Sequence, residues 1–495
     1  MQRLDHLIAC GNSNDPALVE RDRILTRAQL QEQVACVAGA LANRIAPGDR
    51  VAIWLPKTLE MVVALLAVSR AGGIAVPVNP VLRGAQAAYV LNDSGAVLTI
   101  SHAPRARLLA DPPPVILVEK DWSGLLAAGP ASDDAAGGDA LAALLYTSGS
   151  TGRPKGVMVT HRNLLLGAQS VTEYLGTDAT DRVLAALPLS FDFGLSQVTT
   201  ALHAGATAVL LDYLTPRDVV QACARHGITQ LAAVPPLWMQ IAGLVWPDEA
   251  RTGMRTLSNS GGRLPVPMVR QLRTLFPAAR LHLMYGLTEA FRSTTLPPEL
   301  VDTFPDSIGR AIPHAEILVV RPDGTVTADD EPGELVHCGP LVAQGYWQDS
   351  MRTAERFRAA PAASRYGGTA VWSGDTVVRD AQGLLRFVGR DDEMIKTMGT
   401  RLSPTEVEEL AYASGAVAQA VALGVADAAA GQVIRLVASP AAGMSSDDAE
   451  AKVRAYLRRE GAPYMQPASY VWRDALPVSA NGKLDRAALR LEFGA

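Results

Sequence analysis

The chain has few cysteines, and their spacing argues against two classes of protein. Only 4 of its 495 residues are cysteine, at positions 10, 36, 223 and 338, and no two of them form a CxxC pair. A disulfide framework or a structural zinc site would need closely spaced sets of cysteines or paired ligands. Neither is therefore expected, and this cysteine usage fits a reducing compartment, the cytoplasm.

The chain also lacks a basic excess and a long uninterrupted apolar run. Lysine and arginine number 45 against 50 aspartate and glutamate, which gives a net charge of −5 and disfavours a general nucleic-acid binder. Residues 193–211 and 228–247 are uncharged, but polar residues dilute the first stretch and two prolines interrupt the second. A membrane-spanning helix needs about 20 mostly apolar residues. Both stretches therefore predict buried strands and helices, and no membrane span is expected.

Short apolar strands alternate with helical segments in the first half of the chain. Residues 51–55 and 74–78 have the pattern of buried strands, and residues 30–43 and 61–71 have helical spacing. This alternation predicts an α/β fold with parallel-rich sheets flanked by helices. From residue 308 to residue 346, short strands and turns predict an antiparallel, barrel-like subdomain. We predict two domains: a large N-terminal domain over 1–390 and a small α+β domain over 391–495.

The most informative stretch is residues 144–157, LLYTSGSTGRPKGV. An apolar strand leads into a loop of glycines and hydroxyl residues that ends in Lys155. Small residues let backbone N–H groups approach a polyphosphate, hydroxyls add donors, and the lysine adds a positive charge. The loop differs from the GxxxxGK[ST] motif because Gly156 follows the lysine. The candidate phosphate-binding residues are Thr147, Ser148, Gly149, Ser150, Thr151, Gly152 and Lys155.

The string TSGSTGRPKG resembles the signature loop of the adenylate-forming enzymes, which include acyl-CoA synthetases, amino-acid adenylation domains and luciferases. Three further motifs follow in that family's order. YGLTEA at 285–290 resembles its adenine- and metal-binding motif, and SGD at 373–375 with the later GR at 389–390 resembles its ribose-binding motif and hinge. NGKLDR at 481–486 resembles its catalytic-lysine motif. The resemblance spans nearly the whole chain and implies an ATP-dependent ligase that uses Mg²⁺.

The resemblance implies a reaction in which a carboxylate attacks the α-phosphorus of ATP, pyrophosphate leaves and an acyl-adenylate forms. Positioned cations and donors stabilise the charge that develops in such a transition state. In this scheme Glu289 holds Mg²⁺, Thr288 bonds the α-phosphate, and Lys483 bridges the substrate carboxylate and the α-phosphate. The implied nucleotide-binding residues are Tyr285 stacked on adenine, Gly261 and Gly262 on its other side, Asp375 on the ribose hydroxyls, and Arg390 at the hinge.

The family's second half-reaction passes the acyl group to a thiol after the C-terminal domain rotates. The pivot matches Asp392, and residues 396–401, KTMGTR, resemble the segment that reaches the active site for this step. Lys396 and Gly399 are therefore assigned to the thiol step, where glycine permits close approach of a narrow pantetheine arm. No segment after Glu492 could house a carrier domain, so the thiol is expected in trans, on CoA or on a phosphopantetheinyl carrier protein.

The segment PLSFDFGLSQ at 188–197 carries the best clue to the acid. At this point in amino-acid adenylation domains an aspartate pairs with the substrate's α-ammonium group, and here the residue is Asp192. A carboxylate buried in an apolar segment is costly unless it is paired. The first prediction is therefore an amino acid that is activated and passed to a carrier protein. The other predicted pocket residues are Phe193, Ser196, Met284 and Arg292.

Arg292 opens a direct alternative to the amino-acid prediction. Its guanidinium could meet a second carboxylate or polar group on the substrate, or it could neutralise Asp192 and remove the need for an ammonium. In the second case the chain would be an acyl-CoA ligase for an acid without an amine. The motifs resemble both the stand-alone prolyl-type adenylating enzymes and the exosortase-associated acyl-CoA ligases, and the sequence leaves both open. A luciferase-type oxidase and a non-catalytic nucleotide sensor are disfavoured, the latter because Lys483 is present.

Overall fold

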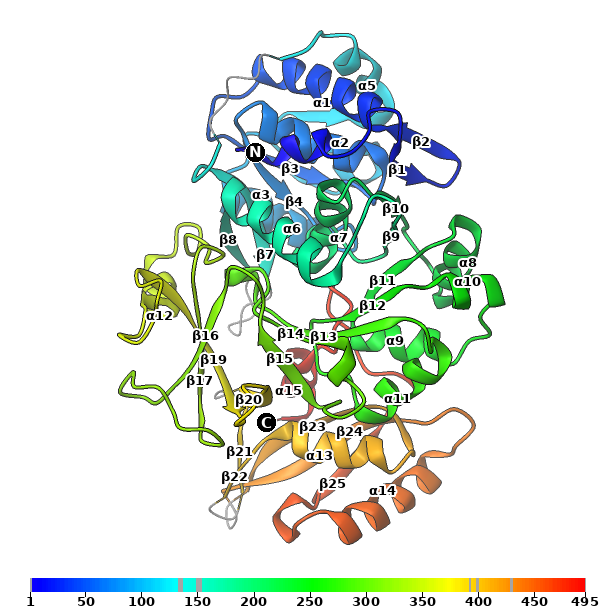
Figure 1. The fold of residues 1–495 in the computed structure, drawn as a ribbon, viewed down its shortest axis with the longest axis vertical. Helices are drawn as coiled ribbons and strands as arrows, with labels where there is room; N and C mark the ends of the chain where they lie inside the picture. The colour runs from blue at the N-terminus through cyan, green and yellow to red at the C-terminus, as the bar shows by residue number, and fades with distance from the viewer. Residues whose placement is uncertain are drawn as a thin grey trace.

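A computed structural model describes residues 2–131, 137–147, 154–390, 393–397, 400–427 and 431–494, without the side chains of residues 400 and 401. Its elements lie in an upper sheet with helices, a larger sheet below it, and a C-terminal domain at the opposite end from the N-terminus (Figure 1). The α/β fold with a large N-terminal and a smaller C-terminal domain, which the sequence predicted, is confirmed. The exact domain boundary at 390/391 stays a prediction.

The first sheet has six strands in the order β6-β5-β3-β4-β7-β8. All neighbours are parallel except β7 and β8, which form an antiparallel pair. Buried apolar residues make up most of its central strands, as parallel strands covered on both faces require. The strands are β3 (Arg50–Trp54), β4 (Ile74–Pro77), β5 (Leu98–Ser101), β6 (Val115–Leu117), β7 (Leu141–Thr147) and β8 (Lys155–Thr160).

The second sheet has 14 strands, and its first part is parallel from β1 through β10, β9, β11 and β12 to β13. These strands are β1 (Pro16–Glu20), β9 (Arg182–Ala185), β10 (Thr207–Leu210), β11 (Gln230–Ala233), β12 (Thr256–Asn259) and β13 (Arg280–Tyr285), with β2 (Arg23–Thr26) antiparallel at the edge. Because parallel strands end at the same edge, the loops after β12 and β13 meet there.

The antiparallel part predicted after residue 308 continues this same sheet beyond β13. The added strands are β14 (Thr294–Leu296), β15 (Ser307–Ala311), β16 (Glu316–Val320), β17 (Pro332–Cys338), β18 (Phe357–Ala359), β19 (Thr369–Arg379) and β20 (Leu385–Arg390). Their pairs are antiparallel, as predicted. β14 and β15 connect β13 to β20 and β19, which carry the ribose motif, within one sheet.

Two helices pack against each other between the two large sheets, α6 (His161–Leu175) and α7 (Asp192–His203) (Figure 1). Thr160 caps α6 through its hydroxyl, which accepts from the Asn163 N–H, and Gly176 ends the helix in the left-handed conformation with φ of 62°. One apolar core contains side chains of both helices and of strands from both sheets. The first half of α6 and most of α7 are thereby packed into the core that joins the two sheets.

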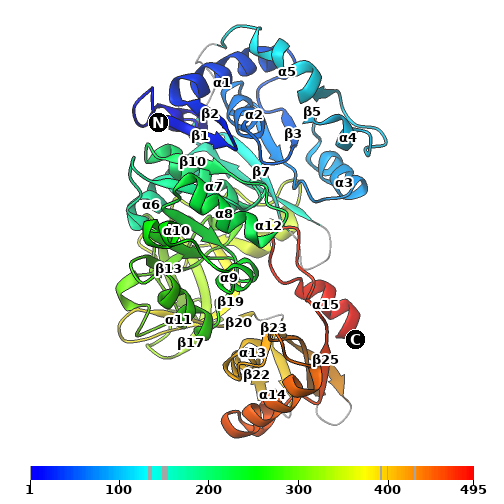
Figure 2. The same ribbon diagram turned by 90° about the vertical axis from the view of Figure 1, so that its right-hand side faces the viewer.

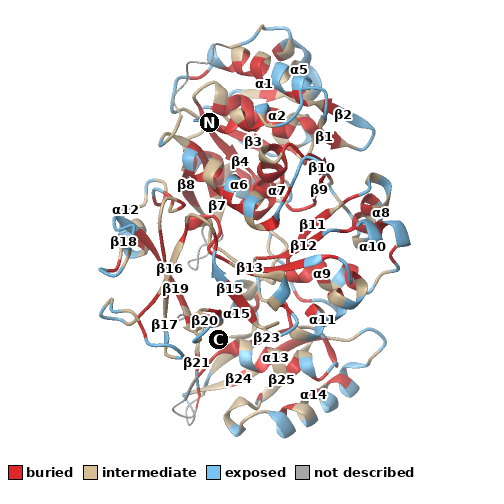
Figure 3. Ribbon diagram, viewed as in Figure 1, coloured by how far each residue is buried: buried red, intermediate tan, exposed pale blue. Residues whose placement is uncertain are grey.

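Of the remaining N-terminal helices, α2 is buried in the central core and the others lie on the outside of the sheets. Buried residues concentrate on the strands and on the inward faces of these helices, and exposed residues on the outer helical faces (Figure 3). They are α1 (Arg27–Ala42), α2 (Leu59–Arg70), α3 (Gly84–Ser94), α4 (Ala103–Ala106), α5 (Val118–Leu126), α8 (Pro216–His226), α9 (Pro235–Ala242), α10 (Asp248–Gly253), α11 (Val266–Leu275) and α12 (Ser350–Arg356), with short 3₁₀ turns η1 (Leu4–Ala9), η2 (Thr288–Ala290) and η3 (Pro298–Leu300).

The C-terminal domain has a five-stranded sheet and an apolar core of its own. Its strands are β21 (Ile395–Thr397), β22 (Thr400–Leu402), β23 (Val417–Asp427), β24 (Gly431–Pro440) and β25 (Ser469–Trp472), and its helices are α13 (Pro404–Ala413), α14 (Ser446–Glu460), η4 (Pro463–Met465) and α15 (Arg486–Phe493). The segment before α15 rises from this domain toward the N-terminal sheets (Figure 2). Among the described residues no helix is long and apolar enough to cross a membrane.

Candidate active site

The predicted site residues converge where α7 begins and where β12 and β13 end. Asp192 is the first residue of α7, Tyr285 is the last residue of β13, and Thr288 and Glu289 follow in η2. The loop with Gly261 and Gly262 follows β12. Ligands of open α/β sheets bind at this edge, beyond the carboxyl ends of the strands.

The phosphate loop joins β7 to β8, and the register of this antiparallel pair sets Thr147 opposite Lys155. The predicted residues Ser148, Gly149, Ser150, Thr151 and Gly152 lie outside the described residues. The hydroxyl of Thr147 is buried and has no hydrogen-bond partner in the part of the chain that the structure describes. A free hydroxyl at the base of the loop fits an additional acceptor such as a phosphate oxygen.

Lys155 and Glu289 form the centre of a partly buried polar cluster with Tyr346. The ammonium of Lys155 lies 3.2 Å from Glu289 Oε1 and donates to the Tyr346 hydroxyl at 2.6 Å, and that hydroxyl donates to Glu289 Oε1 at 2.6 Å. Burial acts to raise the pKa of Glu289, but the positive charge of Lys155 and the hydrogen bond from Tyr346 together keep that pKa below the ordinary value. Glu289 is therefore an ionised carboxylate beside a lysine.

A divalent cation fits this cluster in one particular way. No group of three or more histidine, cysteine, aspartate or glutamate side chains in the described residues could hold a metal ion by itself. Mg²⁺ is commonly bound by one or two carboxylates together with substrate phosphates. Glu289 is suited to be that single carboxylate, with the remaining ligands from ATP and water.

The predicted ribose carboxylate lies close to the predicted adenine residue. Asp375, 4% exposed, accepts a hydrogen bond from the Tyr285 hydroxyl at 2.5 Å and lies 3.1 Å from Arg390 Nε. Burial raises the pKa of Asp375, which the charge of Arg390 counteracts. These three residues come from β13, β19 and β20, so the antiparallel extension of the sheet assembles the predicted nucleoside pocket.

Lys483 reaches the same site from the C-terminal domain. A Cβ placed on Gly261, whose φ is +78°, would lie 2.7 Å from the Lys483 Cε atom, so a larger residue there would displace the lysine. The ammonium lies 4.7 Å from the centre of the Phe191 ring. Burial lowers the pKa of Lys483, and Asp192 opposes that effect. The side-chain amide of Asn79 holds the lysine loop by donating to the Ala480 carbonyl oxygen at 2.8 Å.

Asp192, the residue predicted to bind a substrate ammonium, forms an ion pair with Arg292. Arg292 Nη1 donates to Asp192 Oδ2 at 2.6 Å, and the side chains of Arg292 and Asp192 are 1% and 6% exposed, respectively. The Thr288 hydroxyl donates to Asp192 Oδ1 at 3.1 Å. Phe291 precedes the arginine with φ of 62°, and its carbonyl oxygen accepts from Arg292 Nη1 at 2.8 Å. This rarely populated backbone conformation aims Arg292 at α7.

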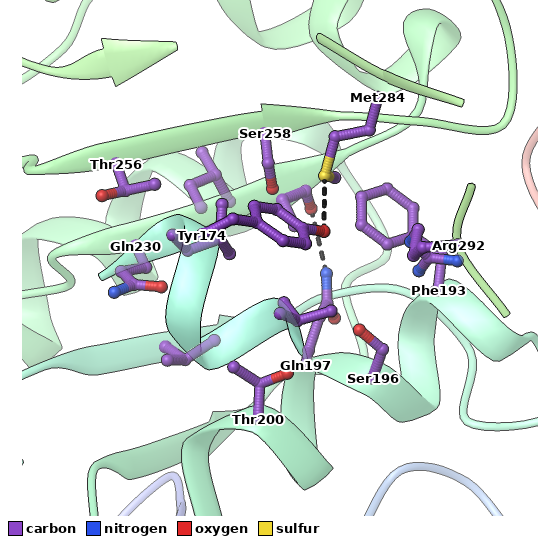
Figure 4. A pocket seen from close by; sticks show the side chains of 15 residues that line it. Tyr174, Phe193, Ser196, Gln197, Thr200, Gln230, Thr256, Ser258, Met284 and Arg292 are labelled. Atoms are coloured by element: carbon purple, nitrogen blue, oxygen red, sulfur yellow. Dashed lines mark hydrogen bonds between the residues drawn. The ribbon is translucent and has the colours of Figure 1, made fainter. Parts of the chain in front are cut away.

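Arg292 also lines a narrow internal cavity with the other predicted pocket residues. Phe193, Ser196 and Met284 border it, and the Arg292 guanidinium stacks 4.5 Å from the centre of the Phe193 ring (Figure 4). The cavity volume is about 30 Å³. Nε and Nη2 of Arg292 are buried and have no hydrogen-bond partner among the described residues.

Of the residues predicted for the thiol step, the structure describes Lys396, and it does not bring this lysine into the site. Lys396 is exposed on β21, and its backbone N–H donates to Gln432 Oε1 at 2.7 Å, on the neighbouring strand β24. Asp392 and Gly399 lie outside the described residues. The structure thus sets Lys483, and not Lys396, beside the predicted nucleotide pocket.

Sequence reasoning missed three residues of the site. Tyr346 contacts Glu289 from 57 positions away, Asn79 contacts the lysine loop from about 400 positions away, and Tyr174 of α6 borders the cavity. Tyr346 stands in the tripeptide Gly-Tyr-Trp, and Asn79 stands in a Pro-Val-Asn-Pro turn after β4. Neither pattern carries a chemical signal by itself, because only the fold brings these residues to their partners.

The sequence profile described as "AMP-binding enzyme" matches residues 8–347, and that described as "AMP-binding enzyme C-terminal domain" matches residues 406–483. The chain belongs to the AMP-binding enzyme family. The two matches fall on the predicted large domain and on the predicted small domain that carries the lysine motif.

Curated relatives of this AMP-binding enzyme fall into two groups. Tyrocidine synthase 3 of Brevibacillus parabrevis is 31% identical over 96% of the chain, which spans only 7% of that protein. Feruloyl-CoA synthase of an Amycolatopsis species is 32% identical over 95% of the chain and 94% of its own length. The chain thus spans less than a tenth of the peptide-synthetase relative.

Solved structures resemble this AMP-binding enzyme over its full length. The o-succinylbenzoate coenzyme A synthetase of Bacillus subtilis, solved in complex with ATP and a magnesium ion, is 27% identical with a TM-score of 0.83. The alignment covers 99% of both chains. The two predicted domains of the fold therefore have counterparts in one known enzyme.

Proposed function

We propose that this chain is an AMP-forming acyl-CoA ligase that activates a carboxylic acid without an α-ammonium group and passes its acyl group to coenzyme A. The ion pair between Arg292 and Asp192 carries this proposal. Asp192 occupies the position from which the resemblance implied recognition of an ammonium. Since Arg292 already supplies the positive charge, an ammonium would place a second cation beside the guanidinium, which like-charge repulsion opposes.

The unpartnered groups of Arg292 define the acid further. Its Nε and Nη2 lie in a nearly water-free environment without a partner among the described residues. Leaving a buried donor unpaired costs about 1–3 kcal/mol. An acyl group with a carboxylate, hydroxyl or carbonyl oxygen close to Arg292 would remove that cost. We therefore propose an acid that carries a second hydrogen-bond acceptor.

Each residue of the site has a task in the adenylation step. The substrate carboxylate attacks the α-phosphorus of ATP, the bond to the β-phosphate oxygen breaks, and pyrophosphate leaves. The Lys483 ammonium would hold the two reacting anions together, and Lys155 would hold the phosphates of the leaving group. Bound Mg²⁺ supplies charge neutralisation on the phosphates, and Glu289 would be its protein ligand. Asp375 would orient the ribose through its acceptor oxygens.

The thiol step needs different residues at the same cleft. The thiol sulfur attacks the carbonyl carbon of the acyl-adenylate, AMP leaves, and the thiol proton is released. We propose that rotation about Asp392 withdraws Lys483 and brings Lys396 and Gly399 to the cleft. The exposure of Lys396 on β21 supports this role, because the side chain is free of the core that holds the rest of the strand.

The relatives support the ligase class in unequal measure. Feruloyl-CoA synthase is matched over nearly its whole length, and the structural relative quoted above is a coenzyme A synthetase. The peptide-synthetase relative supports a second candidate, which is an amino acid passed to a carrier protein. The Asp192 carboxylate has about four acceptor sites, and hydrogen bonds from Thr288 and Arg292 use two of them. In this second candidate the substrate ammonium would donate to the remaining sites.

ATP–pyrophosphate exchange without thiol tests the proposal. The panel should contain the proteinogenic amino acids, and monocarboxylic, hydroxy, keto and dicarboxylic acids matched in length. We expect exchange with acids that lack an amine, and faster exchange with those that carry a second acceptor. Arg292→Met should erase that advantage and leave the plain acids less affected. Exchange confined to one amino acid would contradict the proposal and support the carrier-dependent candidate.

A further inference from the structure

The cavity beside Arg292 is one of two pockets that share a lining side chain. Tyr174, in the last turn of α6, borders this cavity on one face and a second pocket of about 600 Å³ on the other. Figure 4 shows its ring lying across the cavity, with its hydroxyl directed at Met284. That hydroxyl lies 3.0 Å from the Met284 sulfur atom.

The strand beneath Tyr174 explains why the two compartments adjoin. Side chains on one face of a strand recur every second residue, so Arg280, His282 and Met284 of β13 share a face. Met284 borders the first cavity, and Arg280 and His282 border the second pocket. The centre of the Tyr174 ring lies 6.1 Å from the centre of the His282 ring, and its hydroxyl contacts Met284. The ring therefore lies between the His282 and Met284 positions of the strand.

The neighbouring strands show the same division. Thr256 and Ser258 of β12 pair with Arg280 and His282 and border the first cavity, whereas Thr295 of β14 borders the second pocket. Tyr174 therefore stands over β13 as a partition between the β12 side and the β14 side. Its half-buried state follows from its position, because one face of the ring meets the second pocket.

The sizes of the compartments differ in a way that matters for an acid. At about 30 Å³ the first cavity has room for about two water molecules. Only a short acyl group fits there after small shifts of flexible side chains such as Met284. The second pocket is 20-fold larger in volume (600 against 30 Å³), and its lining combines prolines and alanines with the charged residues Arg273, Arg280 and Glu299.

One residue that lines the second pocket has a buried polar atom without a partner. His282 is 2% exposed, and its Nε2 has no hydrogen-bond partner in the described part of the chain. Burial lowers the pKa of His282 to about 4, so the ring is neutral at physiological pH. A neutral imidazole nitrogen suits an uncharged polar group at the far end of an otherwise apolar chain.

We propose that Tyr174 is the residue that limits the length of the acid, and that the pocket beyond it is a dormant extension of the acyl site. This proposal rests on the proposed ligase function. In the native enzyme the ring closes the first cavity and selects short acids. Removal of the ring would join the compartments and admit acids that extend toward His282.

The test measures ATP–pyrophosphate exchange with a homologous series of straight-chain acids of increasing length, for the wild-type chain, Tyr174→Ala and Tyr174→Phe. One methylene group that does not fit a closed pocket changes kcat/KM by about 10-fold or more. We expect the ratio of kcat/KM for long over short acids to rise at least about 10-fold in Tyr174→Ala. Tyr174→Phe keeps the ring and should keep the wild-type ratio. Tyr366→Ala, on an exposed tyrosine away from the cavity, is the control for surface truncation.

The outcomes separate the two proposals. An unchanged ratio in an active Tyr174→Ala variant would overturn the partition while the ligase function stands. If the wild-type chain exchanged pyrophosphate with no acid, the ligase function would fail and the partition with it. If Tyr174→Ala were folded but inactive with every acid, binding would be tested instead, as the rise in melting temperature that each acid causes without ATP. A larger shift with long acids would support the partition, and equal shifts would overturn it.

Discussion

The guanidinium of Arg292 and the carboxylate of Asp192 form a buried ion pair with a 2.6 Å contact at the first turn of α7. They lie 100 positions apart in the chain and meet because α7 begins at the same cleft as the turn that follows β13. The pair makes this end of the acyl cavity neutral overall, while Arg292 keeps donors available for an acceptor on the substrate.

The first prediction concerns the stability of this pair. Removing one partner of a buried ion pair leaves an uncompensated charge and costs about 3–5 kcal/mol. Asp192→Asn and Arg292→Met should each lower the free energy of unfolding by about that amount, and the double variant should lose less than the sum. Urea unfolding measures this.

The matched control for that cycle is the exposed pair of Arg321 and Glu331, whose side chains are 38% and 35% accessible. Exposed pairs contribute about 0–1 kcal/mol, so Arg321→Met should have little effect. Additive losses at Asp192 and Arg292 would show that the two charges are not coupled in solution.

The second prediction concerns Tyr346. Tyr346→Phe removes the hydroxyl that joins Lys155 to Glu289 but keeps the ring, which packs edge-on against Phe357 at 5.4 Å. Hydrogen bonds to charged groups contribute about 1.5–3 kcal/mol, so the KM for MgATP should rise about 10-fold or more. Steady-state kinetics over a range of Mg²⁺ concentrations measure this. A KM within about twofold of wild type would exclude a role for the hydroxyl in organising Glu289.

The third prediction separates the two lysines. Lys483→Ala should lower ATP–pyrophosphate exchange by about 100-fold or more, because it removes a positive charge placed at the reacting oxygens. Lys396→Ala should leave exchange within about threefold of wild type and slow thioester formation instead. Pyrophosphate exchange and thioester yield are measured on the same preparations. A similar loss of exchange in both variants would contradict the proposed division of labour.

The fourth prediction concerns acid. Burial lowers the pKa of His337 to about 3, and the pKa of His161 to about 4. Both fall below the unfolded value near 6.5, so the unfolded chain binds protons first. Stability is complete above pH 6.5 and falls as the pH drops toward 4, by about 1.4 kcal/mol per pH unit for each such histidine.

Urea unfolding at pH 7, 6 and 5 measures this loss, and His337→Asn isolates one contribution. Asparagine can keep the hydrogen bond with Ser293, which His337 Nδ1 makes at 2.9 Å, and it does not titrate. The variant should lose less stability on acidification than the wild-type chain. An identical pH profile would show that His337 does not remain neutral in the folded protein.

Local pattern was sufficient for much of the fold. The apolar runs at 51–55 and 74–78 form β3 and β4, and the helical spacings at 30–43 and 61–71 fall within or beside α1 and α2. Burial on both faces and strand-to-helix alternation operate over a few residues, so they can be read along the chain. The adenylating family was likewise evident from four ordered motifs, and the profile matches confirm it.

The pairing of Asp192 was decided by tertiary structure. The sequence supplied both an aspartate suited to an ammonium and an arginine able to neutralise it, and it left the choice between them open. The ion pair depends on the geometry of Phe291 and on the packing of α6 and α7 between the sheets. For the same reason, the sequence did not identify Tyr346, Asn79 and Tyr174 as residues of the site. Their partners come from elements far away in the chain, and only long-range packing determines which side chains share a cavity.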